Sequence, residues 1–106
     1  MLVVSSPDIP GKKIVKTLGL VKGNTIRARH IGKDILAAFK NIVGGEIQEY
    51  TKLMAESREQ AIDRMVQEAE QLGANAIISV STTTSVISQG AAELLVIGTA
   101  VVIEEE

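Results

Sequence analysis

Three basic side chains between residues 27 and 33 have the spacing of an anion site. Arg27 and Arg29 lie two residues apart in a stretch of strand composition, so both side chains point to one strand face. Lys33 opens a predicted helix, and helix N-termini attract anions through free N–H groups and the helix dipole. The cluster predicts either a site for a phosphate or carboxylate, with arginines as paired donors, or ion pairs with glutamates of residues 46–56 in another subunit. We favour the ion pairs.

A carboxylate and a phenol follow the glycine pair Gly44-Gly45. Glu46 and Tyr50 lie about one helical turn apart, which would suit proton transfer. A helix-to-helix corner with a capping Glu and a packed Tyr explains the same letters more simply. The chain has no phosphate-binding glycine loop, no dinucleotide fingerprint and no HExxH motif. We therefore predict no catalytic residues, no enzymatic activity and no cofactor.

Composition removes further classes of function. The 106 residues include no cysteine, one histidine (His30) and 2% aromatic residues, with a net charge of −2. Disulfides and thiolate chemistry are excluded, and stacking on nucleic-acid bases has no platform. No apolar run approaches the roughly 20 residues that span a bilayer. The sequence predicts a cytoplasmic protein without nucleic-acid or membrane partners.

The elements that must position these residues follow from the hydrophobic periodicity. Residues 13–29 are rich in β-branched residues and predict one bent strand or two, with a bulge at Gly19 and a kink or turn at Gly23-Asn24. Apolar residues then recur at helical steps over 32–43 and again over 47–72, where Ser57 is a candidate cap and kink. Gly73 stops the second helix. Residues 74–88 and 94–103 return to strand composition and predict an antiparallel hairpin.

The order of two strands, two helices and two strands predicts a single α+β domain over residues 1–106, with two helices packed on an antiparallel sheet. The last strand, Leu94–Ile103, does not alternate apolar with polar residues, so both of its faces call for cover. Two helices cover one face only. We expect a homo-oligomer, against the alternative of a strand enclosed within the monomer, and the candidate interface residues are Leu94, Val96, Val101 and Ile103. A hydroxyl row on the preceding strand (Ser79, Ser81, Thr83 and Ser85) would line a polar channel or face solvent.

Three stretches carry a family resemblance that covers essentially the whole chain. NIVGGEIQEYTKLMAESREQAIDRMVQEAEQLGANAI (41–77) and GTAVVIEE (98–105) resemble the YbjQ-like family, labelled "putative heavy-metal-binding", and GKKIVKTLGLVKGNTIRAR (11–29) is similar in kind. The resemblance implies a small α+β subunit of a ring-shaped homo-oligomer, a pentamer. It implies no established reaction. Any ligand would then lie at a groove between subunits or on the ring axis.

This chain has few of the side chains that bind heavy metals. Soft metals prefer thiolate or imidazole donors in groups of three or four. Cysteine is absent and His30 is the one histidine, which makes it a weak metal candidate. Some relatives carry acidic residues where this chain reads SVSTTTS, and hydroxyls are poor ligands for soft metals. A metal- or small-anion-binding module therefore ranks as the alternative to a non-enzymatic homo-oligomer.

Overall fold

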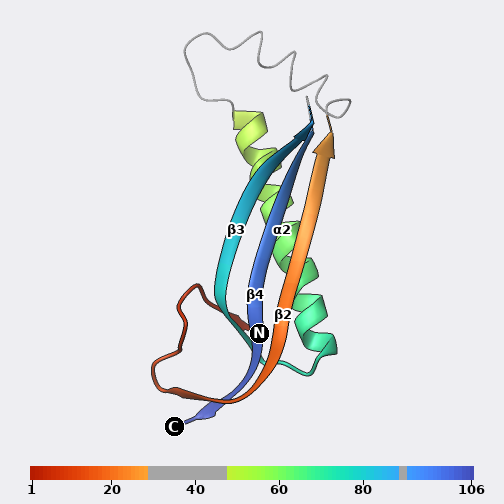
Figure 1. Ribbon diagram of the computed structural model, residues 1–106. Helices are drawn as coiled ribbons and strands as arrows, with labels where there is room; N and C mark the ends of the chain where they lie inside the picture. The colour runs from red at the N-terminus through yellow and green to blue at the C-terminus, as the bar shows by residue number, and fades with distance from the viewer. Residues whose placement is uncertain (29–47, 89–90) are drawn as a thin grey trace.

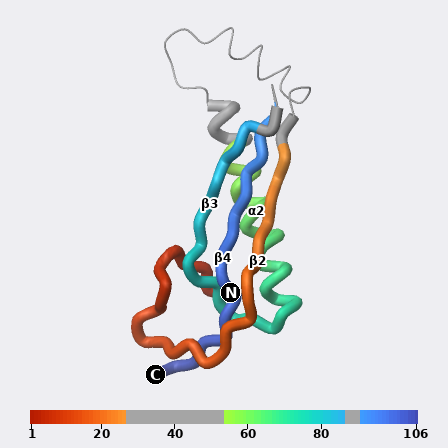
Figure 2. Tube along the Cα trace, in the orientation of Figure 1, coloured from red at the N-terminus to blue at the C-terminus, as the bar shows by residue number. Residues whose placement is uncertain are grey.

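The fold is a curved sheet with a long helix lying along one of its faces (Figure 1). The computed structural model describes residues 1–28, 48–88 and 91–106, with the side chains of 27–28, 48–53 and 87–88 left aside. In chain order the elements are β1 (Leu2–Val3), β2 (Lys12–Ala28), α2 (Gln48–Gln71), β3 (Ala76–Ser88) and β4 (Ala91–Glu105). The strand order in the sheet is β1-β3-β4-β2. Figure 2 follows the same path as a Cα trace.

Two parts of the predicted fold class are wrong. The sheet is mixed rather than antiparallel, because Leu2–Val3 pairs in parallel with Ala76–Ile77. A parallel neighbour needs a long crossover connection, and here β2 and α2 lie between the two strands in the chain. The described residues contain one helix rather than two, in the order β-β-α-β-β. The helix expected over residues 32–43 lies outside the described residues.

The hairpin and its bulges follow the sequence closely. β4 is the central long strand and pairs antiparallel with both β3 and β2, which confirms the predicted hairpin. β2 is one strand of 17 residues, and its register shifts at Gly19, where φ is 123°. The bulge expected at Gly19 is therefore confirmed. The kink expected at Gly23-Asn24 is wrong, because the pairing with β4 continues through both residues.

α2 presents one apolar stripe to the sheet and ends in a Schellman motif. Ala61, Met65 and Ala69 are fully buried at four-residue steps. At the C-terminus the Ala74 amide bonds the Ala69 carbonyl and the Gly73 amide bonds the Glu70 carbonyl, with φ of 86° at Gly73. Within the described part of the chain, no helix combines the length and hydropathy required to cross a membrane.

Ser57 does not cap a second helical segment, because the helix runs unbroken from residue 48 to residue 71. Ser57 is buried instead, 1% exposed, at the contact with the sheet. The Thr25 hydroxyl of β2 donates a hydrogen bond to the Ser57 carbonyl at 3.2 Å. This bond gives the buried hydroxyl of Thr25 a partner and holds the helix backbone close to β2.

Gly23 is the point where α2 lies directly on the sheet. A Cβ atom placed on Gly23 would stand 1.9 Å from the Ala61 carbonyl oxygen and 2.7 Å from the Met65 amide nitrogen. No side chain fits in that space. The buried cluster around this contact joins Val21 of β2, Val96 of β4 and Met65 of α2. The helix is therefore centred over the β2 side of the sheet.

A smaller core lies on the opposite sheet face near the chain termini. Ala76, Ile78 and Val101 are buried there beneath Val4 and Ile9 of the N-terminal segment. The N-terminal chain continues along β3 by backbone bonds from the Val4 amide to Ile77 and from the Val80 amide to Val4. The segment therefore covers the lower part of this face and the lower edge of β3.

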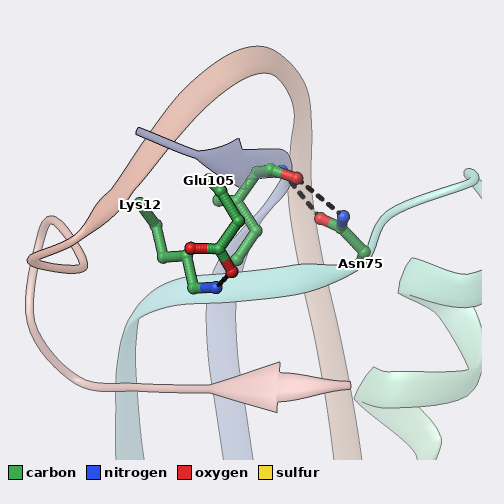
Figure 3. A network of polar contacts seen from close by, with 4 residues as sticks. Lys12, Asn75 and Glu105 are labelled. Atoms are coloured by element: carbon green, nitrogen blue, oxygen red, sulfur yellow. Dashed lines mark hydrogen bonds and ion pairs between the residues drawn. The ribbon is translucent and has the colours of Figure 1, made fainter.

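Asn75 fastens the end of β4 to the turn between α2 and β3 (Figure 3). Its side-chain amide donates to the Ile103 carbonyl at 2.9 Å, and its carbonyl oxygen accepts from the Ile103 amide at 2.7 Å. The side chain thus pairs with the strand as a backbone neighbour would. Lys12 and Glu105 form an ion pair beside it, joining the start of β2 to the end of β4.

A bulge in β3 changes which hydroxyls share a face. Ile78 pairs with Thr99 and Ser81 with Ile97, so Ser79 and Val80 together face Gly98, with φ of 55° at Ser79. The predicted row therefore begins at Ser81, because Ser79 belongs to the bulge. Gly98 makes room for the bulge, since a Cβ there would lie 2.6 Å from Ile77 Cγ2.

We expect Gly23→Ala to destabilise the subunit by about 3 kcal/mol, because the added methyl group overpacks the contact and pushes α2 off β2. The measurement is the urea unfolding midpoint followed by circular dichroism. Lys16→Ala is the control on the same strand, with an exposed side chain and an expected change within about 0.5 kcal/mol. Equal stability of the two variants would contradict the close helix–strand contact.

Candidate functional site

The sheet face turned away from α2 is the candidate functional surface. Side chains alternate along each strand, so the buried residues Val21, Gly23 and Thr25 assign their even-numbered neighbours on β2 to this other face. The registers extend the assignment to β4 and β3. We call this surface the open face, and its members are Leu20, Lys22, Asn24, Ile26, Ser81, Thr83, Ser85, Glu93, Leu95, Ile97 and Thr99.

The open face exposes large aliphatic side chains. Leu20 is 67% exposed and Ile26 is 54% exposed, both on β2. Leu95 and Ile97 of the central strand are half-buried, although β4 has a neighbour on each side. Burying a large aliphatic side chain is worth about 1.5–3 kcal/mol. These four residues therefore give the open face a strong tendency to be covered.

Polar groups stand among these aliphatic side chains. The Asn24 amide donates to the Glu93 carboxylate at 3.1 Å across the β2–β4 pair. Ser81, Thr83 and Ser85 are exposed on β3 beside Ile97, Leu95 and Glu93 respectively. Lys22 adds one cation. An apolar centre mixed with polar groups is typical of protein interfaces rather than of a deep catalytic pocket.

The structure divides the four predicted interface residues between two cores of the subunit. Leu94 and Val96 point toward α2, with 5% and 0% exposure. Val101 is buried beneath the N-terminal segment, and Ile103 packs beside it. The residues of β4 that remain open to a neighbour are the odd-numbered ones between them, led by Leu95 and Ile97.

One residue of the sequence could have shown whether the even- or the odd-numbered residues of β4 face the helix. β4 is apolar on both faces, so hydropathy does not show which residues face the helix. Gly98 is the exception, because a glycine in a central strand marks close approach from one side. Ile77 and Val80 occupy that side. Counting outward from Gly98 would have assigned Leu94 and Val96 to the core and Leu95 and Ile97 to the open face.

Most of the predicted ligand site lies outside the described residues. Arg29, His30, Lys33 and Glu46 belong to residues 29–47. Arg27 is next to the last residue of β2, in register with Ala92. Tyr50 is in the first turn of α2. The end of β2 and the start of α2 lie at the same end of the sheet (Figure 1), so the anion cluster stays a prediction for that end of the molecule.

Comparison with known proteins places this chain among close relatives. A family model described as "Putative heavy-metal-binding", of the YbjQ family, matches residues 1–104. A UPF0145 protein of Dehalococcoides mccartyi is 57% identical, covering 98% of this chain and 100% of its own. A UPF0145 protein of Clostridioides difficile is 54% identical over 100% of this chain and 95% of its own.

A more distant protein of known structure shares the fold. A crystal structure of a protein of unknown function of the DUF74 family, from Pediococcus pentosaceus, superimposes with a TM-score of 0.58. The alignment covers 100% of this chain and 98% of that chain at 18% identity. This likeness concerns the fold alone.

The donor set of this chain does not fit a soft heavy metal. The described residues contain no group of three or more His, Cys, Asp or Glu side chains placed to hold an ion. The whole sequence has no cysteine and a single histidine. Tight soft-metal sites need several thiolate or imidazole ligands, so one subunit lacks the donors that such a site requires.

We expect protein purified without an affinity tag to contain zinc, copper and cadmium only far below one ion per subunit. Elemental analysis of the purified protein measures this ratio. His30→Ala should leave folding and assembly unchanged. One ion per subunit in the unmodified protein that is lost in His30→Ala would contradict the expectation and restore a metal role for this family member.

The anion-site alternative predicts that the cluster responds to phosphate through its arginines. Titration with inorganic phosphate, followed by NMR, should then shift the amides of Arg27 and Arg29, because a bound anion changes the local field. The amide of Lys16, another basic residue of β2, is the control. Unmoved arginine amides would leave ion pairing as the role of the cluster.

Proposed function

We propose, from the premise that this chain belongs to the YbjQ family, that it functions as a non-enzymatic homo-oligomeric protein whose subunits cover one another's open faces. The observation that supports this most directly is the aliphatic content of the open face. On the face opposite the helix, Leu20 is exposed and Leu95 and Ile97 are only half-buried by the described residues. A second copy of the chain carries the same aliphatic surface, which is also stabilised by burial.

The dimensions of the elements support assembly as well. α2 has 24 residues and a length of about 36 Å. β4 has 15 residues, which corresponds to about 50 Å of strand. The helix occupies one face, and the N-terminal segment covers the lower part of the other around Val101. Within the described residues, the upper part of the open face is left for a neighbour.

We take the assembly to be a closed ring of five copies, as the family resemblance implies, and its location to be the cytoplasm, as the composition led us to expect. A ring turns equivalent surfaces toward a common axis and repeats each polar group around it. The hydroxyls Ser81, Thr83 and Ser85 would then face that axis together with Lys22. A ligand of the assembly would bind between subunits at these repeated groups and would not be chemically converted there.

The test is Ile97→Asp. A carboxylate on the open face would be buried against a neighbour at a cost of several kcal/mol, so we expect the assembly to separate into single subunits. Helix content should stay unchanged because Ile97 faces away from α2. Native mass spectrometry gives the stoichiometry, and circular dichroism gives the helix content.

Ala55→Asp is the matched control, since it adds the same charge at an exposed position of α2. This variant should assemble like the unmodified protein. A stable single subunit in the unmodified protein would refute the proposal, and so would an Ile97→Asp variant that assembles as fully as the control.

A further inference from the structure

α2 is displaced toward one edge of the sheet. Its backbone lies directly over Gly23 of the edge strand β2, as the 1.9 Å approach of a virtual Cβ to the Ala61 carbonyl oxygen shows. A helix is about 10 Å wide, and strands are spaced about 4.8 Å apart. Half of its width therefore extends beyond β2 by about one strand spacing. A strand paired with the outer edge of β2 would lie beneath this overhang.

On the opposite side of the sheet, the helix does not cover β3. Thr82, Thr84 and Val86 are on the helix-side face of β3, and all three are exposed, Val86 by 80%. α2 does not reach over them. The other face of the same segment carries the exposed hydroxyls Ser81, Thr83 and Ser85. Both faces of β3 beyond Val80 are therefore uncovered by the described residues.

The outer edge of this segment also presents backbone groups to a partner. The Val80 amide points away from β4, because it donates to the Val4 carbonyl. Backbone direction alternates every second residue, so the amides of Thr82 and Thr84 point outward as well. The N-terminal strand pairs along β3 only as far as Val80. Residues 81–88 contain no proline and no charge, the devices that usually protect a free edge.

The outer edge of β2 is the matching surface. The Asn24 carbonyl points away from β4, since it accepts a hydrogen bond from the Arg64 guanidinium of α2. By the same alternation, the amide and carbonyl of Lys22 face outward. Gln60, Arg64 and Gln67 follow one another at four- and three-residue steps, so they share this side of α2. Polar side chains thus line the overhang above the edge of β2.

We propose that the outer edge of β3 at residues 81–88 pairs with the outer edge of β2 in a second copy of this chain, beneath that copy's α2. The inference rests on the proposed function, because it requires a homo-oligomer. β2 and β3 both run antiparallel to β4, so an axis along the strands brings them together in parallel. The contact uses two different surfaces of one chain, and such contacts close into rings.

This pairing covers the helix-side face of β3, which each copy leaves uncovered. The partner's α2 would lie over Thr82, Thr84 and Val86, whose β-branched side chains form a flat surface that a helix can approach. The threonine hydroxyls meet the polar side of that helix, where Gln67 can exchange hydrogen bonds with them. The free amides of Thr82 and Thr84 gain carbonyl partners from β2. One contact therefore satisfies the edge and the helix-side face of β3 together.

The experiment uses the absence of natural cysteine. Thr83→Cys is co-expressed in turn with Leu20→Cys, Lys22→Cys and Ile26→Cys, all on the open face, and the protein is oxidised mildly. Paired strands lie within the Cα separation that a disulfide spans, about 4.4–6.8 Å, and the next strand beyond does not. We expect a disulfide between Thr83→Cys and at least one β2 variant, and none in Thr83→Cys alone.

A second pair of variants tests the hydrogen bonds of the edge. Thr84→Pro removes an outward amide and leaves the bonds to β4 intact, so assembly should weaken about tenfold, as expected for one or two lost hydrogen bonds. Thr84→Val keeps the amide and loses only the hydroxyl, so its assembly should weaken clearly less than that of Thr84→Pro. Analytical ultracentrifugation measures assembly, and circular dichroism verifies that helix content is equal in the two variants.

The outcomes separate this inference from the proposed function. A stable oligomer that forms no disulfide with any of the three β2 positions refutes the edge pairing and leaves the oligomer standing. A disulfide within Thr83→Cys alone also refutes it, because it indicates β3 paired with β3 of a second copy. An unmodified protein that sediments as a single subunit refutes both.

Discussion

The contact between the backbone of α2 and Gly23 determines the arrangement of the whole subunit. It exists because one residue of an edge strand has no side chain, so that the Ala61 carbonyl and the Met65 amide can lie against β2. The Thr25 hydroxyl, bonded to the Ser57 carbonyl, holds the helix at the same height one step along the strand. With the helix fixed there, β3 is left outside its reach.

The two edges of the sheet differ because of this displacement. β2 carries a bulge at Gly19, exposed lysines and the Arg64 side chain on its Asn24 carbonyl, all of which discourage pairing with unrelated strands. β3 is protected by the N-terminal segment only as far as Val80. The edge of β2 is protected against pairing with unrelated strands, whereas the edge of β3 beyond Val80 is open to pairing. This difference favours a contact in which β3 of one copy meets β2 of another.

The sequence predicted the long elements well because their periodicity is local. Gly19, Gly73 and the hairpin were found from turn chemistry and alternation, which depend on neighbouring residues. The parallel pairing of Leu2–Val3 with β3 was missed because it joins segments that are far apart in the chain. Gly23 was interpreted as a kink or turn. The sequence alone does not distinguish a glycine that lets a helix backbone approach a strand from a glycine that bends the strand. Leu94 and Val96, which were named as interface candidates, are buried in the subunit, and the apolar residues on both faces of β4 do not show which face the helix covers.

The composition of β3 fits a strand that must be stable both before and after assembly. Threonine favours extended backbone through its branched Cβ atom, and its hydroxyl keeps the strand hydrated while no partner is present. Valine or isoleucine at Thr82 and Thr84 would give the same backbone preference but would expose two more aliphatic side chains beside Val86. Charged residues would protect the edge and would also prevent pairing. Threonine, which is β-branched and carries a hydroxyl, keeps the edge hydrated in a single subunit and still allows it to pair with another copy.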